Sequence, residues 1–194
     1  THRHQFANQE RQIAINKKME YDYKQVRRAV LGKTKDDIEF SIIIPVHSNS
    51  DYTQKCLKAL FQTSYLHNIE IIIIDNDSDS ETKKLLATLG GFAKIIVNVK
   101  NESYSHANNQ GASIAKGKYL VFMNNDVQGI SGWMEAFEDT FEKDPTIGIQ
   151  GAKLLYPNEK IQHAGIVWGP IPELKNMNLH YHIHLLEDAE DLKV

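Results

Sequence analysis

A short apolar segment that ends in three polar residues constrains the fold of this 194-residue chain more than any other feature. Residues 119–123 have the length and the aromatic and β-branched content of a fully buried strand. Asn124, Asn125 and Asp126 follow directly. In open α/β sheets, ligands bind beyond the carboxyl ends of the strands, so Asp126 is placed to bind a metal ion or a polar ligand. A local Asx-type turn is the alternative interpretation, because these side chains also hydrogen-bond nearby backbone.

Strands and helices are expected to alternate along the first two thirds of the chain. Apolar runs predict three earlier strands, at residues 40–45, 69–74 and 94–99, with Pro45 as the expected end of the first. One-sided apolar periodicity predicts the helices, at residues 51–63, 79–89, 105–116 and 132–143. This order predicts an α/β fold with a mainly parallel sheet and helices on both faces.

Capping residues predict where three of these helices begin. Ser50 or Asp51 is expected to cap the helix after the first strand. Ser78 and Glu81 have the spacing of a capping box ahead of the next helix. Ser131 is expected to cap the helix that follows Asp126.

Residues 1–38 form a separate polar segment, rich in Gln, Lys and Arg. Five apolar residues recur there at helical spacing: Ile15, Met19, Tyr23, Val26 and Val30. The pattern predicts a long amphipathic helix. Such a helix is either a solvated linker that packs on the following domain or a surface that docks a neighbouring domain.

The region after residue 144 is expected to be rich in short strands. Apolar runs at residues 147–150, 153–156 and 161–168 predict this β-rich extension. His180, His182 and His184 alternate at the strand period. A polar strand edge is the favoured interpretation, and a metal site remains open because alternate residues reach the same side of a strand.

Charge and composition exclude several classes of protein. The net charge of −3 and the pI near 6.3 argue against a nucleic-acid partner, which requires a basic surface. The one cysteine, Cys56, cannot form an internal disulfide. No segment approaches the ~20 apolar residues of a transmembrane helix. We therefore expect a cytoplasmic protein without a transmembrane segment, with peripheral attachment to the inner face of the membrane as an alternative.

Three of the predicted strands end in polar residues, at 45–49, 75–79 and 124–126. Parallel strands bring their carboxyl ends to one edge of the sheet, where a nucleotide would bind. The sequence contains neither of the common glycine-rich phosphate loops. A divalent cation, Mn²⁺ or Mg²⁺, held by Asp126 is therefore the expected means of binding phosphates.

Four separated motifs resemble, in order and spacing, those of the family 2 inverting glycosyltransferases with the GT-A fold. They are Ser-Ile-Ile-Ile-Pro-Val-His at 41–47, Glu-Ile-Ile-Ile-Ile-Asp-Asn-Asp-Ser-Asp at 70–79, Asn-Glu-Ser-Tyr-Ser-His-Ala-Asn-Asn-Gln-Gly at 101–111 and Asn-Asn-Asp at 124–126. Gly-Ala-Lys-Leu-Leu-Tyr-Pro at 151–157 and Ile-Gln-His-Ala-Gly at 161–165 resemble the rhamnosyltransferase-type branch. The resemblance covers about residues 40–168.

The resemblance implies a nucleoside-diphosphate sugar as donor and a glycan or polysaccharide as acceptor. It implies that residues 39–194 are a nucleotide-sugar-binding domain, truncated before its acceptor-binding half. The residues implied to bind the donor are Pro45, Val46, His47, Asn49, Asp75, Asp77, Asn109, Asn124 and Asn125. Asp126 and His163 are the implied metal ligands, and a structural role for His163 remains equally open. The chain departs from the family at His47, where tyrosine is more usual, and at 124–126, where only the last carboxylate of Asp-x-Asp is kept.

The resemblance also implies the reaction. An acceptor hydroxyl would attack the anomeric carbon from the face opposite the departing nucleoside diphosphate, with a carboxylate as general base. In the family that base follows a Gly-Gly-Phe-Asp-like segment, which this sequence lacks, so the catalytic base is unknown and is expected beyond the chain end. The alternative is a non-catalytic, glycosyltransferase-like module that binds nucleotide or scaffolds a larger assembly.

Overall fold

A computed structural model describes residues 37–64, 67–171 and 174–182. The chain divides into two compact units, Thr1–Ala136 and Phe137–Val194, which we describe separately. The amphipathic helix predicted within residues 1–38 falls almost wholly outside the described residues, as does His184, and both remain predictions.

The first unit contains a parallel sheet, which has the order β3-β2-β1-β4 among the described residues. Its strands are β1 (Phe40–Val46), β2 (Ile69–Asn76), β3 (Lys94–Asn98) and β4 (Tyr119–Phe122). The helices are α2 (Ser50–Thr63), α3 (Ser80–Ala87), α4 (Tyr104–Ile114) and α5 (Trp133–Lys143), which runs on past the end of this unit. The predicted α/β fold is therefore confirmed.

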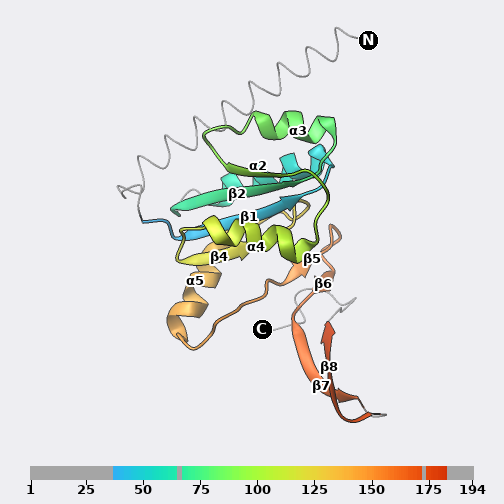
Figure 1. Cartoon of the computed structure of the whole chain (residues 1–194). Helices are drawn as coiled ribbons and strands as arrows, with labels where there is room; N and C mark the ends of the chain where they lie inside the picture. Colours follow the sequence, from blue (N-terminus) through green and yellow to red (C-terminus); the bar gives the residue numbers. More distant parts are fainter. Residues whose placement is uncertain (1–36, 65–66, 172–173, 183–194) are drawn as a thin grey trace. The chain divides into compact units, whose positions relative to one another are not determined.

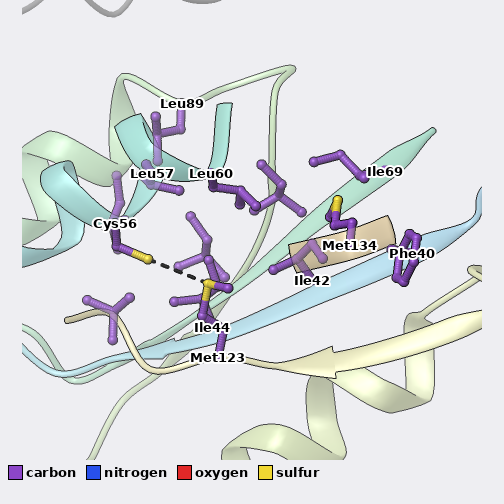
Figure 2. Close-up of a cluster of buried hydrophobic side chains, with 14 residues drawn as sticks. Phe40, Ile42, Ile44, Cys56, Leu57, Leu60, Ile69, Leu89, Met123 and Met134 are labelled. Carbon is purple, nitrogen blue, oxygen red and sulfur yellow. Dashed lines mark hydrogen bonds between the residues drawn. The ribbon is translucent and has the colours of Figure 1, made fainter. Parts of the chain in front are cut away.

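Side chains of the central strands alternate between two apolar cores, one on each face of the sheet. Ile42 and Ile44 of β1 pack in the larger core with Leu57, Leu60 and other residues of α2 and α3 (Figure 2). Ile43 points the other way and packs in a core that includes Ala107 of α4. Helices α2 and α3 thus cover one face of the sheet and α4 covers the other (Figure 1).

Gly111 lets α4 lie close to the sheet. A Cβ at this position would stand 2.5 Å from Ile43 Cγ2 and 3.0 Å from Ile74 Cδ1. Real Cβ atoms do not approach other carbons so closely, so a larger residue requires the helix or the strand to move. The small residues of α4 thereby set the distance between this helix and β1 and β2.

The chain changes direction across the sheet after β3. It runs outward from β1 to β2 and β3, and α4 then crosses β2 and β1 to reach β4 on the far side. The carboxyl ends of β1 and β4 therefore form a topological switch point, which is where open α/β sheets bind ligands.

Strand β4 differs from its prediction, because it lies at an edge of the described sheet. Tyr119 and Val121 pack against the larger core, whereas Leu120 and Phe122 are 45% and 50% exposed. The expectation of a fully buried strand was wrong, since an unbroken apolar run does not reveal how many neighbours a strand has.

Pro45 does not end β1, which continues to Val46. The carbonyl of Ile43 accepts a hydrogen bond from Met123 N, so alternate residues of β1, including Pro45, direct their backbone groups toward β4. Proline has no backbone N–H, and an N–H at position 45 would face the chain after the end of β4 at Phe122. The proline therefore removes no hydrogen bond between β1 and β4.

Two helix starts also differ from the sequence predictions. Asn49, in the left-handed region, precedes α2 and makes no side-chain capping bond, so Ser50 and Asp51 lie inside the helix. Asp79 caps α3 by accepting a hydrogen bond from Thr82 N. Ser78 does not act as the cap, because its hydroxyl donates to Val46 O.

The second unit contains two antiparallel strand pairs among its described residues. β5 (Leu154–Leu155) pairs with β6 (Ile161–His163), and β7 (Ile166–Ile171) pairs with β8 (Leu174–His182). The β-rich extension and the strand containing His180 and His182 are confirmed, whereas residues 147–150 form no strand. Within the described parts of the chain, no helix is both long enough and apolar enough to cross a bilayer.

Candidate active site

The parallel register brings together the ends of β1, β2 and β4. Val46 of β1 lies opposite Asp75 of β2, and Ile43 of β1 lies opposite Phe122 of β4. The polar segments that follow these residues therefore leave the sheet at the same edge, as the sequence predicted. This edge includes the switch point between β1 and β4.

Serine hydroxyls hold the loops after β1 and β2 together. Ser48 N donates to Ser78 Oγ and Asp79 N donates to Ser48 Oγ, both at 3.1 Å. Ser78 Oγ in turn donates to Val46 O, also at 3.1 Å. These hydrogen bonds fix the β1–α2 loop, in which Ser48 and Asn49 have φ angles of 63° and 61°. Non-glycine residues rarely adopt this region unless their surroundings hold them there.

Asp75, the penultimate residue of β2, and Asp77, the first residue after it, occupy different environments. Asp75 is 3% exposed, and its Oδ1 accepts a hydrogen bond of 2.9 Å from Ser78 N. Asp77 is exposed, has a φ angle of 61°, and its carboxylate lies 3.7 Å from Lys83 Nζ. Asp75 is therefore a carboxylate of fixed orientation, whereas Asp77 faces solvent and a lysine.

The backbone of β2 orients the imidazole of His47. The Nδ1 atom lies 2.8 Å from Asn76 O. A carbonyl oxygen only accepts, so Nδ1 carries the proton and donates it. In the neutral ring Nε2 is then an acceptor. The ring is exposed, so this acceptor is accessible at the carboxyl end of β1.

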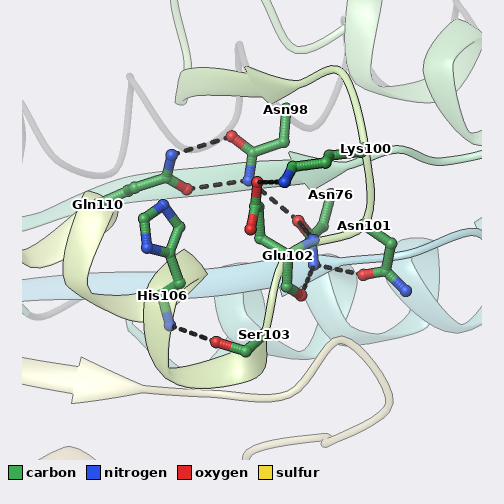
Figure 3. A network of polar contacts seen from close by, with 8 residues as sticks. All are labelled: Asn76, Asn98, Lys100, Asn101, Glu102, Ser103, His106 and Gln110. Carbon is green, nitrogen blue, oxygen red and sulfur yellow. Dashed lines mark hydrogen bonds and ion pairs between the residues drawn. The ribbon is translucent and has the colours of Figure 1, made fainter.

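Asn76 is buried and lies at the centre of a network of amide groups, shown in Figure 3. Its Nδ2 donates to Asn101 Oδ1 and Glu102 O, and its Oδ1 accepts from Glu102 N and Asn98 Nδ2, at distances of 2.7 to 3.0 Å. Asn98 and Gln110 exchange two further hydrogen bonds, at 2.9 and 3.0 Å. The network joins β2, β3, α4 and the loop between β3 and α4, and it supports the carbonyl that orients His47.

The segment after β4 forms a turn that presents Asp126. Val127 N donates to Asn124 O at 3.3 Å, which closes the turn. Asn125 Nδ2 donates to Thr53 Oγ1 at 3.0 Å and to Ser48 O at 3.4 Å. Asn124 and Asp126 are exposed, whereas the side chain of the middle residue, Asn125, is anchored to the protein.

Cys56 lies beneath this turn. Its thiol is 1% exposed, 3.8 Å from Met123 Sδ and 3.7 Å from Asn124 O (Figure 2). Burial, and to a lesser degree the negative charge of Asp126, raise the pKa of Cys56 to about 12. The thiol is thus protonated at neutral pH, and it is a packing residue under the turn rather than a nucleophile.

Exposed oxygen atoms on the turn suit a hard divalent cation. Asp126 offers a carboxylate and Asn124 an amide oxygen, and Mg²⁺ and Mn²⁺ prefer oxygen ligands. A single carboxylate occupies few of the coordination positions of such a cation. Cations that bind substrate phosphates are usually held in this way, with the phosphates and water as the other ligands.

Two of the predicted donor residues, Val46 in β1 and Asn109 in α4, lie outside the loops that follow the strands. The side chain of Val46 is buried in the larger core, so only its backbone faces the loops. Asn109 is exposed on α4, whereas its neighbour Asn108 is buried. Since residues 107 and 111 face the sheet, the 100° step of the helix turns Asn109 away from it. His163 lies in β6 of the second unit, and its role as a metal ligand remains a prediction.

Sequence reasoning missed the residues that support the site. Thr53, Ser48 and Ser78 bind the loops, and Asn76 and Asn98 form the network beneath His47. Asn76 and Asn98 are the last residues of adjacent strands and lie opposite each other. Two asparagines at the ends of adjacent predicted strands were the feature of the sequence from which this network could have been predicted.

Two curated relatives show what the chain is similar to. It is 30% identical over 148 residues to the O-antigen biosynthesis protein RfbC of Myxococcus xanthus, a match that covers 75% of this chain and 11% of that protein. It is 27% identical over 123 residues to the glycosyltransferase AglE of Haloferax volcanii, covering 61% and 40%. The chain thus spans less than half the length of either relative.

A solved structure and a family model complete the comparison. The mannosyltransferase PcManGT from Pyrobaculum calidifontis, in complex with GDP-Man and Mn²⁺, aligns with a TM-score of 0.50 and 17% identity over 74% of this chain and 48% of that one. This likeness supports the fold. The model for Glycosyl transferase family 2 matches residues 41–183, and the chain belongs to that family.

Proposed function

We propose that this chain binds a nucleoside-diphosphate sugar at the β1/β4 switch point and transfers the sugar, with inversion, to a glycan or polysaccharide acceptor. The observation that carries the proposal is the placement of two carboxylates, Asp75 near the carboxyl end of β2 and Asp126 after β4, on either side of β1. Membership of the family supports transferase activity. The name of RfbC supports a polysaccharide acceptor, and the motifs at 151–157 and 161–165 support a rhamnosyltransferase-like branch.

Asp75 and His47 are proposed to contact the nucleoside. Each has one polar atom committed to the protein, Asp75 Oδ1 to Ser78 N and His47 Nδ1 to Asn76 O. Their second polar atoms, Oδ2 and Nε2, are hydrogen-bond acceptors. Both suit the N–H and O–H groups of a nucleoside, and their fixed orientation reduces the entropy lost on binding.

Asp126 is proposed to hold a divalent cation together with the donor diphosphate, with Asn124 beside it. When bound, such a cation supplies positive charge to the leaving nucleoside diphosphate. The PcManGT complex with GDP-Man and Mn²⁺ supports this assignment. Asn125 holds the turn that carries Asp126, and the turn thereby fixes the position of the cation relative to β1.

Release of nucleoside diphosphate from UDP-, dTDP- and GDP-sugars, with Mn²⁺ present, tests the proposal. We expect turnover with donors of one base, loss of most activity in Asp126→Asn, and little change in the control Asp139→Asn on α5. NMR of the released sugar or product reports the anomeric configuration, and retention would contradict the proposed inversion.

A non-catalytic nucleotide-binding or scaffolding module is the second candidate. The helical apolar periodicity within residues 1–38, which suits a surface that docks a neighbouring domain, favours it. Metal-dependent binding of nucleotide without turnover, in the presence of acceptor glycans, would support this candidate over the transferase.

A further inference from the structure

Two threonines of α2 make the same pair of hydrogen bonds at opposite ends of the helix. Thr53 Oγ1 donates to Asn49 O at 3.3 Å and accepts from Asn125 Nδ2 at 3.0 Å. Thr63 Oγ1 donates to Ala59 O at 3.0 Å and accepts from Trp133 Nε1 at 3.0 Å. Both hydroxyls thus bind a segment that follows β4, but only Thr53 binds the turn that carries Asp126.

Asn125 is anchored by the part of the chain that follows β1. Its Nδ2 has two hydrogens, and the two acceptors are Thr53 Oγ1 and Ser48 O. Thr53 is completely buried, so its hydroxyl has a fixed position. The amide nitrogen of Asn125 therefore has no hydrogen left to donate to a nucleotide.

From this geometry we infer that Thr53 and Asn125 form a positioning pair, which fixes the turn at 124–127 so that Asp126 is held ready for the cation and the donor diphosphate. The inference rests on the proposed function. It assigns Asn125 a role different from the donor contact that the family resemblance implies. Asp126 follows Asn125 directly in the chain. A rotation of Asn125 would therefore displace the Asp126 carboxylate, which lies just after the end of β4.

The pair also connects the two halves of the site. Ser48, whose carbonyl accepts from Asn125, is bonded through its own N–H and hydroxyl to Ser78 and Asp79 beside Asp75. The β1–α2 loop is thus the shared support of the turn after β2 and the turn after β4. Loss of the Thr53 hydroxyl is expected to loosen the Asp126 turn and to leave the Asp75 turn in place.

Titration calorimetry of the whole chain with UDP, dTDP and GDP, each with and without Mn²⁺, tests the inference. Thr53→Val keeps the side-chain shape and removes the acceptor, so we expect the Mn²⁺-dependent gain in nucleotide affinity to fall about fivefold to tenfold. Binding without Mn²⁺ is expected to stay unchanged. Thr53→Ser restores the hydroxyl and is expected to recover the gain.

Thr63→Val is the matched control, because it removes the equivalent hydroxyl at the far end of α2. A purely structural role for Thr53 predicts that both valine variants lower the melting temperature and neither alters the Mn²⁺-dependent gain, which would overturn the inference. If the wild-type chain binds no nucleotide with Mn²⁺, the proposed function fails and the inference fails with it. If it binds and Thr53→Val binds equally well, only the inference fails.

Discussion

The Nδ1 atom of His47 donates a hydrogen bond to the backbone carbonyl of Asn76, 2.8 Å away. This contact joins the end of β1 to the end of β2 and leaves Nε2 as an accessible acceptor. The side chain of Asn76 is itself fixed by four hydrogen bonds. The network around Asn76 therefore fixes the carbonyl that orients the His47 ring.

Substitution of His47 separates the two ring nitrogens. Asparagine places an N–H near the position of Nδ1 but nothing near Nε2, whereas glutamine places a polar atom near Nε2. We expect His47→Asn to keep the melting temperature and to lose about tenfold in nucleotide affinity, since one hydrogen bond is removed. His47→Gln is expected to bind more tightly than His47→Asn. Equal affinities of wild type and His47→Asn would exclude a nucleotide contact through Nε2.

Removal of the Asn76 side chain is expected to destabilise the first unit strongly. Asn76→Ala leaves the backbone groups of Glu102 and the amide of Asn98 with unmet hydrogen bonds, at a cost of about 3 kcal/mol in the free energy of unfolding. Asn101→Ala removes one partner from an exposed position and is expected to cost less than ~1.5 kcal/mol. Chemical denaturation measures both values, and similar losses would contradict a central role for Asn76.

Gly111→Ala tests the close approach of α4. The added methyl group would overlap Ile43 Cγ2, and overpacking of this kind costs about 1–3 kcal/mol, more than the gain in helix propensity. Gly90→Ala is the control, since the nearest atom to its added Cβ is Ala87 O at 4.0 Å. An unchanged melting temperature in Gly111→Ala would show that α4 packs less tightly than described.

Glu70 is expected to contribute to acid sensitivity. Burial alone would raise the pKa of Glu70, but hydrogen bonds from Lys94, Ser41 and the backbone of Lys116 outweigh it and lower the pKa below its usual value. A carboxylate with a depressed folded-state pKa stabilises the protein above the unfolded-state pKa, and this stabilisation is lost as the pH falls through the folded value.

The corresponding measurement is the free energy of unfolding between about pH 6 and pH 3. Glu70→Gln is expected to be less stable than wild type at pH 6 and to lose less stability on acidification. The exposed Glu142→Gln should follow the wild-type curve. Parallel curves for Glu70→Gln and wild type would contradict the assignment.

The thiol of Cys56 is expected to be unreactive in the folded chain. Its pKa of about 12 and its burial leave almost no accessible thiolate at pH 8. Because the chain has one cysteine, a disulfide reagent should report a single thiol that reacts only upon unfolding in denaturant. Rapid reaction of the native protein would show that the turn above Cys56 opens.

The sequence predicted the sheet well because its central strands are buried on both faces. Ile42 to Ile44 and Ile71 to Ile74 form unbroken apolar runs, and such runs separated by one-sided helices have few other solutions than a parallel sheet. The polar residues after each run then had to meet at one edge. Asp75 and Asp126 were identified from this pattern and the family resemblance.

The sequence could not show which polar residues support the site and which face the ligand. Asn76 and Asn124 each follow an apolar run, Asn124 directly and Asn76 after one residue. Asn76 is 5% exposed in a network, whereas Asn124 is exposed. Their difference depends on partners such as Asn98 and Glu102, which are more than 20 residues away in the chain. The sequence predicts only that Thr53 lies in a helix, because its role as a hydrogen-bond acceptor depends on the position of the turn after β4.

The account rests on metal-dependent nucleotide binding at the switch point between β1 and β4. Calorimetric titration with UDP, dTDP and GDP, with and without Mn²⁺, on wild type and Asp126→Ala tests it most directly. The account predicts that one nucleotide binds more tightly with Mn²⁺ and that Asp126→Ala abolishes this gain while weak metal-free binding persists. Mn²⁺-dependent binding that survives in Asp126→Ala, or no binding of any nucleotide, would contradict it.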